Sequence, residues 1–223
     1  MPTKDEALVA VYRAAFEAVS IFHEHGLPCC IMGSGAAYLW NRAKARDNIR
    51  TPDDLDLVVM TTREDSEELK RLLVSCGTDF TLENAWNPKK TYKIVFYHTP
   101  LLPEPLKIDL LVPGDLNIPL LPYEAFVHLN ILKALPAADY TLPCMPLLPL
   151  IILKLQAWNN LRNDKQRKDL SGLLRIAPYH SVHVAFGAKL PEAFMQLLTD
   201  LAPNFVEVVP ESKNQWRKIG LML

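Results

Sequence analysis

The sequence has no excess of charge of either sign. Its 223 residues carry 24 Lys and Arg against 25 Asp and Glu, so the formal net charge is −1. Proteins that coat nucleic acid carry a strong basic excess, so this balance argues against a general coat, although it permits a local basic site. With 49% apolar and 22% charged residues, the composition is typical of a globular protein and excludes a disordered chain.

Cysteine pairs and long apolar runs are also missing. None of the four cysteines has a CxxC partner, which argues against a zinc knuckle or a redox motif. We interpret the adjacent Cys29 and Cys30 as small buried side chains in a reducing compartment. The most apolar run, residues 147–153, is far shorter than the ~20 residues that cross a bilayer. The polar start of the chain has no signal-peptide pattern, so we expect a cytoplasmic protein without a membrane partner.

The first half of the chain alternates between helix and strand signals. Thr3 and Glu6 form a capping box and Gly26 ends the apolar periodicity, so a helix is expected over residues 4–25. Short apolar runs predict strands over 29–32, 55–60, 92–97 and 106–112, and further helices are expected over 36–42 and from a Thr62 cap to Ser75. This order predicts an α+β protein with a mixed β-sheet flanked by helices.

Proline marks the change to a second part. Ten of the 18 prolines lie between residues 100 and 149, so we expect a loop-rich stretch that leads into a helical region. Helices are expected there over 147–161, 165–176 and 191–201. We therefore divide the chain into residues 1–118, which hold the sheet, and residues 119–223, which are mainly helical. The charge is also divided, because residues 1–150 carry a net −5 and residues 151–223 a net +4.

Two aspartates share one face of an expected strand. In Asp54-Leu55-Asp56-Leu57 alternate side chains point the same way, so the leucines face the core and the carboxylates lie side by side. Such a pair suits a hard divalent cation such as Mg²⁺, which prefers oxygen ligands; alternatively, both aspartates end the strand in solvent. Asp109, inside the apolar run 106–112, completes a carboxylate triad if its strand lies beside the first. Otherwise it faces water on an edge strand.

A glycine-rich turn follows the first expected strand. Gly33-Ser34-Gly35 joins residues 29–32 to the next helix. Glycines let the backbone approach a phosphate closely, and the N-terminus of a helix supplies N–H donors. By itself the motif is a weak signal, because such a sequence is usually just a turn.

Taken in order, these motifs resemble those of the nucleotidyltransferase superfamily, whose fold is that of the DNA polymerase β catalytic core. The family pattern places Gly and Ser before an aspartate pair, as Gly33 and Ser34 precede Asp54 and Asp56 here, with a third carboxylate on a later strand. The chain looks most similar to the minimal and abortive-infection-type nucleotidyltransferases. Those often carry an arginine and a threonine before the aspartates, and the sequence has such residues in Arg50 and Thr51.

A lysine on an apolar helix face supports the same resemblance. The neighbours of Lys154 at helical spacing are apolar, and a buried ammonium group needs an anion; alternatively, its amine reaches water while its stem stays on the core. The helix pair that contains Lys154, Lys168 and Asp169 looks like a helix pair of the family, in which the lysine faces the triphosphate. Asp169 would then orient either Lys154 or Lys168.

The resemblance implies an α+β, nucleotidyltransferase-like fold and a Mg²⁺-dependent or Mn²⁺-dependent nucleotidyltransferase that binds ATP or another nucleoside triphosphate. The acceptor hydroxyl, on a small molecule, an RNA or a protein, stays open. The implied catalytic and metal-binding residues are Asp54, Asp56 and Asp109. The implied substrate-binding residues are Gly33, Ser34, Arg50, Thr51, Lys154, Lys168 and Asp169. Two alternatives are a non-catalytic nucleotide-binding or toxin–antitoxin-like interaction protein on the same fold, and an unrelated α/β protein with an accidental aspartate motif.

Overall fold

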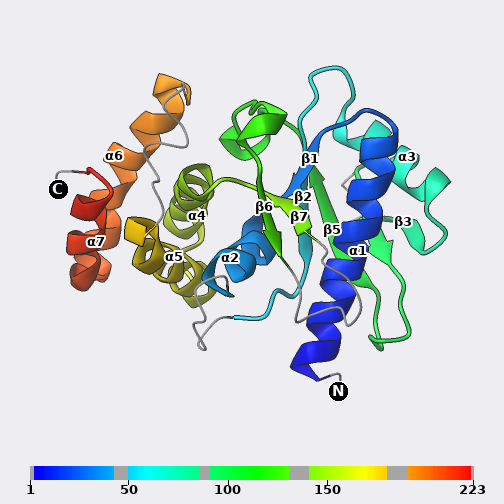
Figure 1. Ribbon diagram of the computed structural model, residues 1–223, viewed down its shortest axis with the longest axis horizontal. Helices are drawn as coiled ribbons and strands as arrows, with labels where there is room; N and C mark the ends of the chain where they lie inside the picture. The colour runs from blue at the N-terminus through cyan, green and yellow to red at the C-terminus, as the bar shows by residue number, and fades with distance from the viewer. Residues whose placement is uncertain (1–2, 43–49, 86–90, 131–140, 180–189, 222–223) are drawn as a thin grey trace.

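Helix α1 (Lys4–Glu24) begins where the sequence predicts it. The computed structural model describes residues 3–42, 50–85, 91–130, 141–179 and 190–221. Thr3 and Glu6 form the expected capping box at the start of α1, which satisfies N–H groups that have no partner inside the helix. The alanine-rich face of α1 is buried and packs on the sheet, and α1 crosses in front of the strands in Figure 1. This helix closes one face of the sheet.

The centre of the described structure is a mixed sheet of seven strands in the order β3-β4-β5-β2-β1-β7-β6. Strands β2 and β5 pair in parallel, as do β1 and β7, and the other neighbours are antiparallel. The strands span Cys29–Ile31 (β1), Leu55–Val59 (β2), Phe80–Asn84 (β3), Lys93–Tyr97 (β4), Leu106–Leu111 (β5), Val127–Asn130 (β6) and Thr141–Cys144 (β7). The expected α+β class with a mixed sheet is confirmed.

Strands β6 and β7 lie in the stretch that we expected to be loop-rich, and that expectation is wrong at this point. Pro143 stands inside β7, which is an interior strand, and a proline argues against such an assignment because it has no N–H to donate. The strand tolerates it because β7 pairs with β1 at one position, between Ile31 and Cys144. The sheet therefore takes strands from both sides of residue 118, and the division of the chain there stays a prediction.

The helices of the second half lie together beside one end of the sheet (Figure 1). Helix α4 (Leu147–Leu161) has the predicted bounds, and α5 (Asp164–Ile176) begins one residue earlier than predicted. Helix α6 (Glu192–Val208) continues past Pro203, beyond the predicted end, because Phe205 is buried against Trp158 of α4 with ring centroids 4.8 Å apart. Helix α7 (Lys213–Lys218) was not predicted. Helix α6 thus packs against α4, and α7 contacts α5.

Two helix starts in the first half differ from the prediction. Helix α2 (Gly33–Arg42) begins three residues early, so Gly33, Ser34 and Gly35 form its first turn. Helix α3 (Ser66–Cys76) is capped by Asp65, which forms a capping box with Glu68, and not by Thr62. For α3, Thr62 and Asp65 are both residue types that cap helices and lie three positions apart, so the sequence alone does not fix which of them begins the helix.

The backbone of Met145 joins the sheet to α4. Its N–H donates to the carbonyl of Ile31 at the end of β1, at 2.8 Å. Its own carbonyl accepts from the indole nitrogen of Trp40 in α2, at 3.0 Å. Met145 precedes α4 by two residues, so the start of α4 is fixed to both β1 and α2.

The four cysteines are unpaired, and three of them are buried. Burial raises the pKa of the Cys29 thiol to about 12, so this group is a neutral packing residue at physiological pH. The expected burial of Cys29 and Cys30 is confirmed. Among the described residues, no helix is both long and apolar enough to cross a membrane.

Candidate active site

Three aspartates meet at one place on the sheet. Asp56 of β2 and Asp109 of β5 are register partners in neighbouring parallel strands, so their side chains lie on the same face. Asp54 precedes Asp56 by two residues and shares that face. One carboxylate oxygen of each residue lies within 4.8 Å of the other two, and all three side chains are half-buried. The structure brings the predicted triad together. The alternative, in which Asp109 faces water on an edge strand, is wrong because β5 lies between β4 and β2.

The three negative charges perturb one another. The pKa of Asp56 is raised from 3.8 to about 6, first by burial and then by the charge of Asp54, with a smaller contribution from Asp109. Lys154 and the backbone N–H of Ser34 act in the opposite direction. A site that holds carboxylates in this unfavourable arrangement fits a cation, and three hard oxygen donors fit Mg²⁺ or Mn²⁺. The residues present therefore suit a divalent metal ion.

Lys107 is a site residue that the sequence reasoning missed. Its ammonium group donates to Asp109 Oδ2 at 2.6 Å. Partial burial lowers the pKa of Lys107, but Asp109, Asp54 and Asp56 together offset this effect and raise it overall. A signal was present, because Lys107 stands two residues before Asp109 on one strand and so shares its face. Lys107 supplies a positive charge to the triad.

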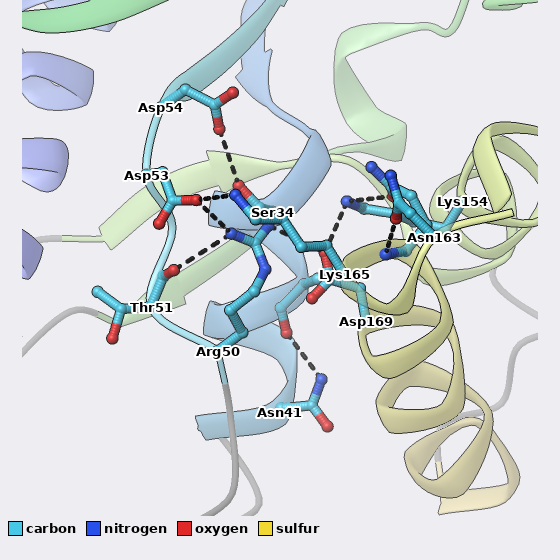
Figure 2. Close-up of polar contacts among 12 residues, drawn as sticks. Ser34, Asn41, Arg50, Thr51, Asp53, Asp54, Lys154, Asn163, Lys165 and Asp169 are labelled. Atoms are coloured by element: carbon cyan, nitrogen blue, oxygen red, sulfur yellow. Dashed lines mark hydrogen bonds and ion pairs between the residues drawn. The ribbon is translucent and has the colours of Figure 1, made fainter. Parts of the chain in front are cut away.

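The N-terminus of α2 packs directly on the triad. Gly33 has φ +60, and a Cβ at this position would overlap the carboxylate of Asp56. The buried Ser34 hydroxyl donates to Asp54 Oδ1 at 3.3 Å (Figure 2). In this structure the motif thus orients the aspartates, and its predicted contact with phosphate stays a prediction. Glycine is required at position 33 for both backbone conformation and space.

Gly33→Ala is expected to lower any metal-dependent activity at least ~100-fold, because displacing a site group by about 1 Å has effects of this size. Gly26→Ala is the matched control. Gly26 also has a left-handed φ, +71, but open space surrounds its Cβ position. Both variants therefore incur the backbone cost of about 1–2 kcal/mol, and only Gly33→Ala displaces Asp56. Activity assays and thermal unfolding of both variants check this; equal activity losses would contradict the steric argument.

A buried ion pair lies on the helical side. The Lys154 ammonium group donates to Asp169 Oδ2 at 2.8 Å and to Gln166 Oε1 at 3.2 Å, and both charged side chains are only 6% exposed. The expected anion partner is therefore present, and the reading in which the amine reaches water is wrong. Of the two lysines that Asp169 was expected to orient, it contacts Lys154, from the facing helix α5.

Arg50 extends this pair towards the sheet. Its guanidinium group lies 3.4 Å from Asp169 Oδ2 and 3.1 Å from Asp53 Oδ2, and Lys165 of α5 also contacts Asp53, at 2.6 Å (Figure 2). The chain segment before β2 is thus tied to α5 by two ion pairs. Sequence reasoning missed Asp53 and Lys165, because 112 positions separate them and no local pattern links them.

The structure does not bring every predicted substrate-binding residue into this network. Thr51 takes part through its backbone carbonyl, which accepts from Arg50 at 3.4 Å. The side chain of Lys168 is exposed on α5, and the ion pairs of Asp169 are with Lys154 and Arg50. The substrate-binding roles of both residues stay predictions.

A cavity of about 240 Å³ lies between the acidic and the basic groups. Asp56 and Gly33 line it from the sheet side, and Lys154 and Gln166 line it from α4 and α5. Asp56 of the carboxylate triad and a buried cation therefore face one space, an arrangement that suits an anionic ligand when the triad holds a metal ion.

Comparison with known proteins gives the class of fold. No protein-family model and no curated protein matches the chain. A crystal structure of an antigenic nucleotidyltransferase-like protein from Paracoccidioides brasiliensis is similar to it with a TM-score of 0.63 and 16% sequence identity, over 98% of this chain and 94% of that chain. The solution structure of the antibiotic-resistance factor ANT(2'')-Ia aligns with a TM-score of 0.48 and 13% identity, over 89% of this chain and 95% of that chain.

The chain therefore has a nucleotidyltransferase-like fold, and the expected fold resemblance is confirmed. The similarity to the Paracoccidioides structure extends over almost the whole chain, including the residues after 175, for which the sequence motifs gave no indication. The narrower resemblance to the abortive-infection type stays a prediction.

Proposed function

We propose that the protein is a nucleotidyltransferase, which moves a nucleoside monophosphate from a nucleoside triphosphate to an acceptor hydroxyl. The observation that carries this proposal is the carboxylate triad, whose oxygens lie within 4.8 Å of one another beside a cavity that the buried Lys154 also lines. Mg²⁺ or Mn²⁺ is the cofactor of the proposed reaction. ATP binding and a cytoplasmic location belong to the same proposal.

Each group has a defined task in the proposed reaction. Asp54, Asp56 and Asp109 would hold the metal ion, which supplies positive charge to the phosphate oxygens and orients them. Lys154 lies across the cavity and would neutralise charge on the β- and γ-phosphates, and Asp169 fixes its position. The start of α2 lines the same cavity through Gly33, and its backbone N–H groups would donate to the same phosphates. Arg50 holds the loop before β2 against α5.

The chemical step is a substitution at the α-phosphorus. The acceptor oxygen forms a bond to this phosphorus, the bond to the bridging oxygen of the β-phosphate breaks, and pyrophosphate leaves. Asp109 is the base that takes the proton of the acceptor hydroxyl, and Lys107, 2.6 Å away, compensates the charge of Asp109 before the transfer. Positioning and charge neutralisation supply most of the rate.

The test uses nucleoside triphosphates labelled at the α-phosphate, with Mg²⁺ or Mn²⁺ and a cell extract as the source of acceptor. Label should pass into a product only with the metal ion, and the size of that product assigns the acceptor to small molecules, RNA or protein. Calorimetry with unlabelled nucleotide and Mg²⁺ accompanies the assay. Binding without transfer of label in any extract would support the non-catalytic alternative, and no metal-dependent binding would overturn the proposed site.

A further inference from the structure

The cavity beside Asp56 has one charged end and one apolar end. Asp56, Gly33 and Lys154 mark the charged end. The remaining wall is mostly leucine, from the end of β5, from the segment after it and from one face of α4. Asp109, the proposed base for the acceptor, does not line it. The cavity therefore extends from the proposed phosphate-binding groups along an apolar wall to which Asp109 does not contribute.

One polar atom in the apolar part has no partner. The side-chain oxygen Oε1 of Gln156 is fully buried and accepts no hydrogen bond within the described structure, although Gln156 lines the cavity. Buried acceptors are nearly always satisfied in folded proteins, so such an atom calls for a donor from elsewhere. Gln166, another amide in the wall, already accepts from Lys154. Because Gln156 lines the cavity, a rotation of its side chain would bring this unsatisfied acceptor to a ligand there.

The mouth of the cavity carries two exposed leucines from different segments. Leu161, at the end of α4, is 60% exposed, and Leu116, in the turn after β5, is 63% exposed. Leu116 also has φ 49 and ψ 27, a left-handed conformation that leucine rarely adopts. Such unfavourable backbone conformations occur preferentially at ligand-binding segments. Two apolar side chains at the mouth favour a flat, uncharged group between them.

We infer that this cavity binds the base of the nucleoside triphosphate and that Gln156 selects adenine, an inference that rests on the proposed function. The exocyclic amino group of adenine would donate to Gln156 Oε1. Guanine and uracil carry a carbonyl oxygen in the equivalent position. Two acceptor oxygens would then face each other, and no hydrogen bond could form. Cytosine has an amino group but only one ring, so it buries less surface against the leucines.

The first test measures the binding of ATP, GTP, CTP, UTP and inorganic tripolyphosphate to the full chain by calorimetry with Mg²⁺. The wild type should bind ATP about tenfold or more tightly than the other nucleotides, because each of them loses a hydrogen bond or apolar contact. Gln156→Leu should lower ATP affinity about tenfold and leave tripolyphosphate affinity unchanged. Gln196→Leu, the same change at an exposed position of α6, is the matched control and should bind all ligands as the wild type does.

Leu116→Asn provides an independent readout. Asparagine tolerates the left-handed conformation, so the metal-free variant should have a melting temperature at least equal to that of the wild type, and its ATP affinity should fall several-fold. If Leu116 had only a structural role, the variant would have a lower melting temperature and an unchanged affinity for ATP. Equal affinity for all four nucleotides, or no effect of Gln156→Leu on ATP, would overturn the base pocket even where nucleotides bind. If the wild type bound neither tripolyphosphate nor any of the nucleotides, the proposed function itself would be overturned.

Discussion

Asp56→Asn should abolish nucleotidyl transfer and at the same time stabilise the metal-free protein. The amide keeps the shape of the side chain but removes one negative ligand from the triad, so we expect the transfer rate to fall at least ~1,000-fold, as for loss of a central electrostatic group in other active sites. Asp109→Asn should have an effect of the same order, because it removes both a ligand and the proposed base. Transfer of labelled nucleotide measures both losses.

The gain in stability follows from the burial of the Asp56 carboxylate and from its repulsion by the other two carboxylates. The folded-state pKa of Asp56, about 6, lies above the unfolded value of about 3.9. The ionised group therefore destabilises the folded state. This destabilisation is small below about pH 4, grows as the pH rises, and is fully present above about pH 6. At pH 7.5 Asp56→Asn should raise the free energy of unfolding by ~1–2 kcal/mol and the melting temperature by roughly 2–6 °C.

Thermal unfolding without metal at pH 4 and pH 7.5 checks this pH dependence. Most of the advantage of the variant should disappear at pH 4, where Asp56 is protonated in the folded state and about half protonated in the unfolded state. Addition of Mg²⁺ at pH 7.5 should stabilise the wild type more than the variant. Asp200→Asn, at an exposed position of α6, is the control for loss of a carboxylate. A variant that is inactive and also less stable at pH 7.5 would contradict the arrangement of the triad.

Lys154→Met should be both inactive and strongly destabilised. The ion pair with Asp169 is buried on both sides, and removal of one partner leaves a buried charge, which costs about 3–5 kcal/mol. Arg50 contacts the same carboxylate at 3.4 Å, so we expect the loss to lie near the lower end of this range. Chemical denaturation measures the stability, and the labelled-nucleotide assay measures the activity.

The double variant Lys154→Met with Asp169→Leu separates the two effects. Replacement of both charges by apolar groups of similar size removes the unpaired charge and should recover most of the stability. Activity should stay low, because the proposed triphosphate contact of Lys154 is absent. Recovery of activity together with stability would show that Lys154 acts only in the fold.

The members of the aspartate triad could be predicted from the sequence because their information is local. The alternation in Asp54-Leu55-Asp56 and the isolated Asp109 in an apolar run follow from strand periodicity. That Asp109 joins the pair depends on the pairing of β2 with β5, which the family resemblance implied and no local pattern encodes. The same periodicity applies to Lys107, which was overlooked because a lysine near a strand end is common on exposed surfaces. Lys154 was found for a different reason, since a lysine among apolar helix neighbours needs a partner.

Long-range features escaped sequence reasoning. The contact between Asp53 and Lys165 depends on where α5 lies relative to the sheet, which no local pattern encodes. Strand β7 was missed because Pro143 argues against an interior strand, although the single pairing position with β1 makes the proline tolerable. The unsatisfied Gln156 oxygen also became visible only with the packing around α4.

Met145 has a consequence for how the proposed site works. Because its N–H is bonded to Ile31 and its carbonyl to Trp40, α2 and the start of α4 are parts of one rigid framework. Gly33 and Lys154 therefore keep their separation before any substrate arrives. In the proposed function, the affinity for a triphosphate would then not be reduced by the entropic cost of assembling its binding groups. A nucleotide would enter a prepared site, and the timing of the reaction would depend on the arrival of the acceptor rather than on closure of a hinge.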